Sequence, residues 1–363
     1  MKKRISKQSR TNFLTYAGVV AAYFLITGYH HFVGLSAMIQ GLLVPICAYV
    51  TMALALNLVV GVSGELSLGH AGFMSVGAFS GTTAALALQS TIPSAPLRLA
   101  VAMVIGAAFA AVVGFLVGIP VLRLNGDYLA IVTLAFGEII KSVLNNLYVG
   151  LDAKGFHISF ITDTVSGRLA EGGKLMIGGP MGISGIKTIS TFTAGAILIL
   201  VALVVIFNLV NSRSGRAIMA IRDNRIAAES VGLNVTKYKL MAFVTSAALA
   251  GAAGTLYTMS LSTIVANKFD FNTSILILVF VVLGGMGNMW GSIISATFLT
   301  LLPELLRKFN LDQYRMLVYA IVLILVMIAT NNPLLQQTMG SVADKLKGKK
   351  KAPAQAGEGG GAQ

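Results

Sequence analysis

The chain has 363 residues, of which 56% are hydrophobic and only 11% are charged, and its formal net charge is +14. Soluble domains carry roughly 25% charged residues, so this composition excludes an ordinary water-soluble protein. The cationic residues gather at the N-terminus, in a central segment and at the C-terminus, between long apolar runs. That distribution is typical of membrane topology, and we predict no nucleic-acid partner for the positive charge.

Residues 1–12 form a basic segment, and the apolar run over 13–32 that follows is too long for the core of a secretory signal peptide. We therefore predict a retained first span. A bilayer requires ~20 apolar residues for each helical span. The apolar runs predict an all-α, polytopic membrane protein of about ten transmembrane helices, some of them broken or re-entrant. The predicted spans are residues 13–33, 37–60, 71–88, 99–120, 128–147, 192–210, 240–260, 273–286, 291–306 and 314–330.

Ten spans return both termini to the same side of the membrane. The basic residues of the N-terminus 1–12, of the central segment 211–239 and of the tail 334–363 would then all lie in the cytoplasm, because Lys and Arg resist translocation. The tail is of low complexity. The permease domain proper is predicted over residues 13–333. A re-entrant element within 273–306 is the alternative that would change the local count.

The segment 63–73, SGELSLGHAGF, places Glu65, Ser67 and His70 among glycines where a span is expected to begin. Glycine releases the backbone from helical geometry, and polar side chains at such a break can satisfy the exposed backbone groups. The segment is interpreted either as a simple interfacial turn or as a non-helical element that lines a transport path. We therefore treat these three residues as translocation-pathway candidates.

Glu138 and Lys141 lie one helical turn apart inside the predicted span 128–147. A charged side chain in the middle of a span costs roughly 2.5–3.5 kcal/mol unless it is paired or hydrated. The two alternatives are a local ion pair and a Glu138 that borders a water-filled path, so Glu138 is a further pathway candidate.

Residues 211–239 are polar, basic and flanked by two apolar runs, which indicates a cytoplasmic loop. Its small residues, Ala227, Ala228 and Gly232, would let a partner surface approach the backbone closely, and Gly232 is suited to a helix C-terminus. The alternative is a solvated basic linker.

A weak internal similarity relates VVGVSGELSLG at 59–69 to VLGGMGNMWGS at 282–292. Paired glycine interruptions in the two halves of a transporter often mark broken helices beside the pathway, and Asn288 is for this reason included among the pathway candidates. Chance similarity between two glycine-rich membrane segments is the alternative.

The chain lacks a phosphate-binding loop, an HExxH motif, a GxSxG motif and any pair of cysteines. Its four histidines show no metal-ligand spacing. We therefore predict that the chain is not an enzyme, has no catalytic residues, and binds neither a metal nor a cofactor.

The AAESxG pattern at 227–232 resembles the coupling loop of ABC importer permeases. More specifically, the chain resembles the larger of the two permease types of branched-chain amino acid ABC importers. The matching segments are NLVVGVSGELSLGHAGFMSVGAF, GDYLAIVTLAFGEII, GGPMGISGI, AIRDNRIAAESVGLNVTKYKLMAF and VLGGMGNMWGSIISATFLTLLPELL, which together extend over about residues 54–306.

The resemblance implies a subunit of an importer in the plasma membrane of a prokaryote. Its partners would be a second homologous permease, two cytosolic ATPase subunits that bind the ATP, and an extracellular or periplasmic substrate-binding protein. It also implies ATP-driven uptake of leucine, isoleucine and valine by alternating access. The coupling role is carried over to Arg222, Asp223, Ala227, Ala228, Glu229 and Gly232.

Two alternative functions stay open at this point. The same family includes permeases for urea and short amides. An ion-coupled secondary carrier would instead use a gradient, and it would transport without ATP.

Overall fold

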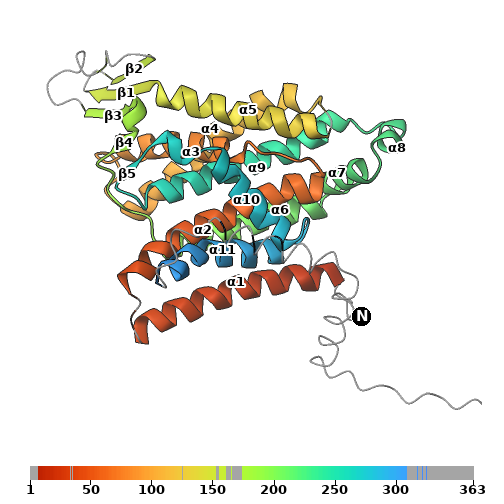
Figure 1. Ribbon diagram of the computed structural model, residues 1–363, viewed down its shortest axis with the longest axis horizontal. Helices are drawn as coiled ribbons and strands as arrows, with labels where there is room; N and C mark the ends of the chain where they lie inside the picture. Colours follow the sequence, from red (N-terminus) through yellow and green to blue (C-terminus); the bar gives the residue numbers. More distant parts are fainter. Residues whose placement is uncertain are drawn as a thin grey trace, which may run out of the picture. The chain divides into compact units, whose positions relative to one another are not determined.

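The computed structural model describes residues 7–32, 34, 36–124, 126–152, 155–160, 165, 174–308, 317, 321 and 324. The chain divides into two units, residues 1–309 and residues 310–363. In the second unit the described residues, Leu317, Ile321 and Ile324, are helical. The rest of the predicted span 314–330, the tail 334–363 and residues 1–6 lie outside the described residues. All the labelled helices and strands of Figure 1 belong to the first unit.

Helices dominate the first unit and occur at each of the first nine predicted spans. They are α1 (Lys7–Phe32), α2 (Ala37–Asn57), the π-helical turn η1 (Leu58–Ser63), α3 (His70–Ala87), α4 (Ala95–Val121), α5 (Asp127–Asn145), α6 (Phe192–Asn211), α7 (Arg213–Asp223), α8 (Arg225–Ser230), α9 (Val235–Thr258), α10 (Phe271–Gly284) and α11 (Met289–Lys308). Among the described residues, six helical stretches are long and apolar enough to cross a membrane. The protein is therefore a predominantly helical, multi-pass membrane protein.

Five short strands occupy the opposite end of the helices from α7 and α8, as Figure 1 shows. They are β1 (Leu147–Asp152), β2 (Gly155–Phe160), β3 (Lys174–Gly178), β4 (Ile183–Ser184) and β5 (Thr263–Ile264). The strands β2, β1 and β3 form one antiparallel sheet, and β4 pairs with β5. These strands were not predicted from the sequence. The strands between α5 and α6 thus lie at the opposite end of the helices from α7 and α8, which belong to the polar segment 211–239.

Helices α3, α4 and α9 pack closely, and glycines allow their backbones to approach one another. A Cβ atom at Gly77 would collide with the backbone of Gly251, and a Cβ atom at Gly251 would collide with Ala110 and with the carbonyl oxygen of Gly106. The Thr255 hydroxyl donates a hydrogen bond to the Gly77 carbonyl at 2.8 Å. Lipid gives no hydrophobic drive between helices, so such close contact stabilises the bundle.

Helix α2 lies against α6, α9, α10 and α11, and its last turns, residues 51–57, are buried throughout. Its Cys47 is 2% exposed, and Gly195 of α6 packs directly on this side chain. The single cysteine of the chain is therefore a small packing residue, as its position in an apolar run predicts.

Candidate functional site

The first break lies between α2 and α3, where η1 ends at Gly64 and the chain stays non-helical as far as Gly69. Gly64 has φ +75, a conformation that glycine adopts without the steric strain of a Cβ atom. Burial alternates along the segment, as in an extended chain with one covered face. Glu65 and Ser67 point into the protein, whereas Leu66 on the other face is 37% exposed.

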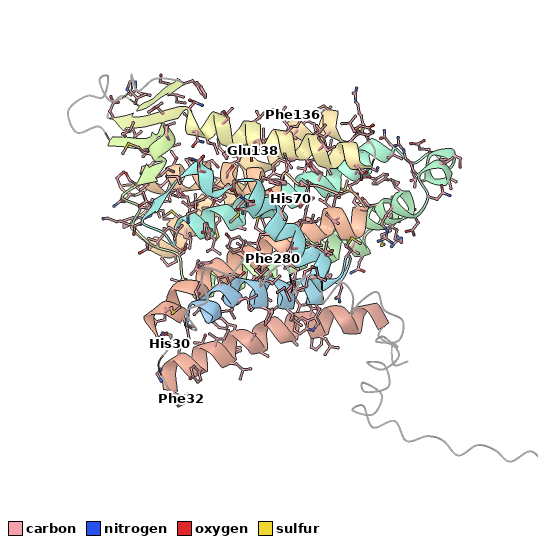
Figure 2. All side chains as sticks on the ribbon, viewed as in Figure 1. His30, Phe32, His70, Phe136, Glu138 and Phe280 are labelled. Carbon is pink, nitrogen blue, oxygen red and sulfur yellow. The ribbon has the colours of Figure 1, made fainter. Side chains whose placement is uncertain are left out.

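The buried face of this segment is held by polar side chains of α9. The carboxylate of Glu65 forms an ion pair with Lys239, and the two side chains are 11% and 7% exposed. Farther along α9, Ser246 lies 2.6 Å from Nε2 of His70, whose Nδ1 is 3.2 Å from the Ser67 hydroxyl. Figure 2 shows His70 among the packed helices. Seven residues of α9 separate the two contacts, so the segment follows this helix for about 10 Å.

Neighbouring helices also satisfy backbone groups of the break. The amide of Leu68 donates to the Thr133 hydroxyl of α5 at 3.0 Å, and the amide of Ala71 donates to the Ser274 hydroxyl of α10 at 3.2 Å. Non-helical backbone at membrane depth is tolerated only where protein or a water-filled cavity covers it. The segment is therefore a largely buried, non-helical connection between η1 and α3 whose backbone groups are satisfied by neighbouring helices.

The second break separates α10 from α11, and it lies directly against the first. Gly285 and Gly287 have φ values of +88 and +83. The side chain of Asn57, at the end of α2, accepts a hydrogen bond from the Gly287 amide at 2.7 Å and donates one to the Ser292 hydroxyl at 2.8 Å. A Cβ atom at Gly61 would collide with Gly287. The two glycine-rich segments whose sequences resemble each other thus meet in space.

Of the remaining pathway candidates, Asn288 lies in the second break and Glu138 lies on α5. Asn288 is exposed, and its side-chain oxygen accepts a hydrogen bond from the Gly291 amide at 3.3 Å, at the start of α11. Glu138, on α5 in Figure 2, forms an ion pair with Lys141, one turn farther along the same helix. The local ion pair, one of the two alternatives weighed from the sequence, is thus present.

The polar segment 211–239 folds into two short helices, α7 and α8. Ser212 accepts a hydrogen bond from the Gly215 amide at 3.1 Å, and Asn224 accepts one from the Ala227 amide at 3.0 Å. Such side-chain caps satisfy the free amides at a helix start. Gly232, with φ +84, ends the α8 turn, as the sequence predicts. The segment is therefore folded into two capped helices, in contrast to the solvated linker that was the alternative interpretation.

The two helices have one inner and one outer face. Ile221 of α7 and Ala228 of α8 pack with Val235 of α9 in a small apolar cluster. On the outer face, Ile226 is 80% exposed and Val231 is 76% exposed. In the sequence, Ile226 and Val231 are isolated apolar residues inside a polar segment, and they are not among the predicted coupling residues. Of the predicted coupling residues, Ala228 is buried, whereas Ala227, Glu229 and Gly232 are exposed.

The last turn of α7 contacts the first break. One guanidinium nitrogen of Arg222 donates a hydrogen bond to the Gly61 carbonyl of η1 at 2.9 Å, and another lies 3.0 Å from the Asp223 carboxylate. Arg225 of α8 instead pairs with Glu229 of the same helix at 2.9 Å. Arg222 therefore links the polar segment to the membrane domain, whereas the Arg225–Glu229 pair lies within α8.

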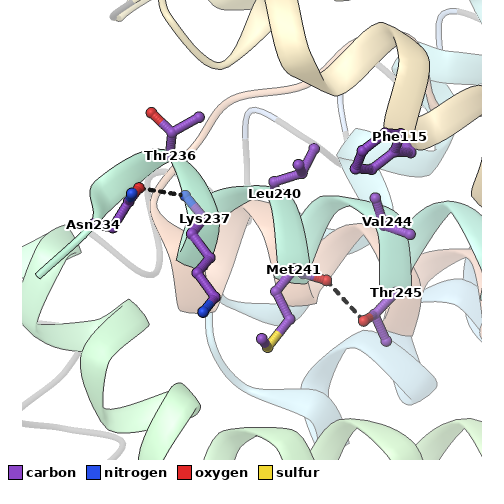
Figure 3. A pocket seen from close by; sticks show the side chains of 8 residues that line it. All are labelled: Phe115, Asn234, Thr236, Lys237, Leu240, Met241, Val244 and Thr245. Carbon is purple, nitrogen blue, oxygen red and sulfur yellow. Dashed lines mark hydrogen bonds between the residues drawn. The ribbon is translucent and has the colours of Figure 1, made fainter.

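A groove of about 530 Å³ begins beside this segment and runs between the first three turns of α9 and the C-terminal part of α4, as shown in Figure 3. Asn234 and Lys237 lie at its polar end, and Phe115, Leu240 and Val244 form its apolar part. Among the described residues, no group of three or more His, Cys, Asp or Glu side chains is arranged to hold a metal ion.

Comparison with known proteins identifies the family. The family model described as "branched-chain amino acid transport system / permease component" matches residues 38–327, which is most of the chain. The chain belongs to this permease family. It is accordingly a permease component and not itself an enzyme. No solved structure matches the chain.

Relatives of the permease family agree with this placement. A high-affinity branched-chain amino acid transport system permease protein, LivM, of Salmonella typhimurium is 37% identical over 307 residues, covering 80% of this chain and 68% of the relative. A probable branched-chain amino acid transport permease protein LivM of Methanocaldococcus jannaschii is 26% identical and covers 67% of this chain and 74% of the relative. The fructose import permease protein FruG of Bifidobacterium longum is 27% identical and covers 65% and 67%.

Proposed function

We propose that this permease imports leucine, isoleucine and valine across the plasma membrane of a prokaryote. In this proposal two cytosolic ATPase subunits bind and hydrolyse ATP, a second homologous permease completes the membrane channel, and an extracellular or periplasmic binding protein delivers the substrate. The chain itself holds no cofactor. The identity to LivM over most of both chains supports the substrate class.

The proposal includes about ten spans with both termini in the cytoplasm. The placement of the strands and of α7 and α8 at opposite ends of the helices supports an odd number of crossings between these two regions. The basic residues of the segment 211–239 then assign its end to the cytoplasm, and the strands to the outer side. The predicted pathway residues Glu65, Ser67, His70, Glu138 and Asn288 stay part of the proposal, with the non-helical segment 64–69 as its central element.

The exposure of two large apolar side chains, Ile226 on α8 and Val231 directly after it, is the observation that carries the coupling proposal. These side chains present apolar contacts to a partner, while Ala228 of the same short, capped helix packs against the membrane domain. A few side chains that fill well-packed, desolvated pockets of a partner carry most of the binding energy of an interface. We infer that α8 inserts these side chains into a groove of the ATPase subunit.

The transport proposal is tested with the complete importer in liposomes. We expect ATP-dependent accumulation of radiolabelled leucine, and inhibition by excess unlabelled isoleucine or valine but not by urea or acetamide. Inhibition by urea or acetamide alone would assign the chain to the amide permeases of the family. Accumulation by this chain alone under an ion gradient would replace the ATP-driven mechanism with a secondary carrier.

Replacing Ile226 with aspartate is expected to weaken binding of the ATPase subunit by about 2 kcal/mol or more, because a charge would be buried in an apolar contact. The measurement is co-purification of the ATPase with the tagged permease from detergent. Arg216→Ala on α7 is the matched control, because Arg216 is exposed and contacts only the Asn211 carbonyl of its own segment in the described structure. Undiminished co-purification of the Ile226→Asp variant would contradict the assignment of this face.

Replacing Gly232 with aspartate is expected to abolish ATP-coupled uptake while the protein still inserts into the membrane. A Cβ atom would meet no neighbour there, but an L-residue at φ +84 is strained by roughly 1–2 kcal/mol, and the new charge lies beside the outer face of α8. Uptake and the amount of protein in the membrane are measured in the same cells. Normal uptake by this variant would count against the coupling role of the segment.

A further inference from the structure

Arg222 makes three kinds of contact within the described structure. One nitrogen donates to the Gly61 carbonyl at 2.9 Å, and two others donate to the same carboxylate oxygen of Asp223 at 3.1 Å and 3.0 Å. Its aliphatic stem covers Gly64, where a Cβ atom would lie 2.5 Å from the Arg222 Cγ. This position of the Arg222 side chain therefore depends on two features. Gly64 has no Cβ atom, which leaves room for the aliphatic stem, and the Asp223 carboxylate orients the guanidinium group.

The Gly61 carbonyl is a suitable acceptor for a cation. It lies in the last turn of η1, where the chain leaves helical geometry at Gly64. The last carbonyls of a helix lack partners within the helix, and the negative end of the helix dipole attracts positive charge there. A guanidinium is planar and always charged, so it holds this carbonyl and the Asp223 carboxylate in one fixed geometry.

Gly61 also touches the second break. A Cβ atom at Gly61 would collide with the backbone of Gly287, and the Asn57 side chain joins the Gly287 amide to the end of α2. A displacement of the Gly61 carbonyl would therefore shift the turn between α10 and α11 as well as the non-helical segment 64–69. Tightly packed backbone with fixed hydrogen bonds deforms little, so it moves as a unit.

We propose that Arg222 is the positioning residue that transmits movement of the coupling segment to both breaks of the membrane domain. This inference rests on the proposed function, because it assumes that the ATPase moves α7 and α8. The exposed Ile226 and Val231 bind the ATPase, whereas Arg222 points the other way and holds the Gly61 carbonyl. Binding of the motor subunit and transmission of its movement thus belong to different side chains of one segment.

The test compares Arg222→Met, Arg222→Lys and Arg216→Ala in the complete importer. Methionine keeps most of the aliphatic stem over Gly64 and removes the guanidinium group. Lysine keeps the positive charge and a single nitrogen that can donate hydrogen bonds. Arg216 is an exposed arginine of the same helix and serves as the control. Three quantities are measured for each variant: co-purified ATPase, ATP hydrolysis with and without substrate-loaded binding protein, and leucine transported for each ATP hydrolysed.

For Arg222→Met we expect normal co-purification of the ATPase, with leucine transported per ATP hydrolysed reduced roughly fivefold or more. Arg222→Lys should recover part of this ratio, and Arg216→Ala should equal the wild type. An unchanged ratio in Arg222→Met, or a loss of co-purified ATPase, would overturn the inference. If Arg222→Met does not accumulate in the membrane, a wild-type ratio in Arg222→Lys overturns it equally. Failure of the proposed function itself would appear differently, as absence of ATP-driven leucine uptake in the wild type.

Discussion

Replacing Gly251 with leucine is expected to remove nearly all correctly folded protein from the membrane. Gly251 lies where α3, α4 and α9 cross, and even a single Cβ atom there would collide with Ala110 and with the Gly106 carbonyl. Overpacking a close-packed interior costs typically 1–3 kcal/mol, and more where backbone rather than a side chain must yield. We therefore expect destabilisation of about 3 kcal/mol or more.

The measurement for Gly251→Leu is the melting temperature and the monodisperse fraction of detergent-purified protein. Gly41→Leu is the control, because Gly41 lies on the exposed first turn of α2 and a Cβ atom there would meet no neighbour within 4 Å. The control should melt close to the wild type. A Gly251→Leu variant that accumulates and melts as the wild type does would show that the three helices do not pack as described.

Replacing Lys239 with methionine is expected to destabilise the protein by roughly 3–5 kcal/mol, because Glu65 would keep a buried charge without its partner. Glu65→Gln should have a similar effect for the converse reason. The double variant, Glu65→Gln with Lys239→Met, should recover most of the loss, since no uncompensated charge remains. Stability is followed by thermal unfolding of the purified permease.

The matched control for this pair is Lys237→Met, which removes an exposed lysine two residues earlier on α9. Exposed charges contribute about 0–1 kcal/mol, so this variant should unfold near the wild-type temperature. A double variant no more stable than either single variant would contradict the buried ion pair. It would indicate instead that Glu65 and Lys239 act separately, for instance with Glu65 facing water.

The helices at the first nine predicted spans could be located from the sequence because each is an apolar run of suitable length. The strands β1 to β5 could not, because they are short, and β5 lies some 80 residues from its partner β4 in the chain. The paired glycine-rich segments 59–69 and 282–292 did indicate both breaks. Their contact with each other is a tertiary feature that follows from the packing of α2 against α10 and α11.

The candidate site was only partly accessible to sequence reasoning. Lys239 was counted among the charges of the cytoplasmic loop, but it is a buried residue of α9, because its partner Glu65 lies 174 positions away in the chain. Likewise, the resemblance selected Arg222 as a coupling residue without distinguishing it from residues of the outer face. The distinction depends on which side of α7 points to the Gly61 carbonyl, and this is fixed only by the folded structure.

The burial of Cys47 has a practical consequence for spectroscopy. A thiol must be reached by solvent and ionised to react, and Cys47 is only 2% exposed, with Gly195 of α6 packed on its side chain. Water-soluble maleimide reagents should therefore leave the wild-type chain unmodified. A second thiol introduced at the exposed Val231 would be labelled selectively, so fluorophores or spin labels can report on α8 without first constructing a cysteine-free background.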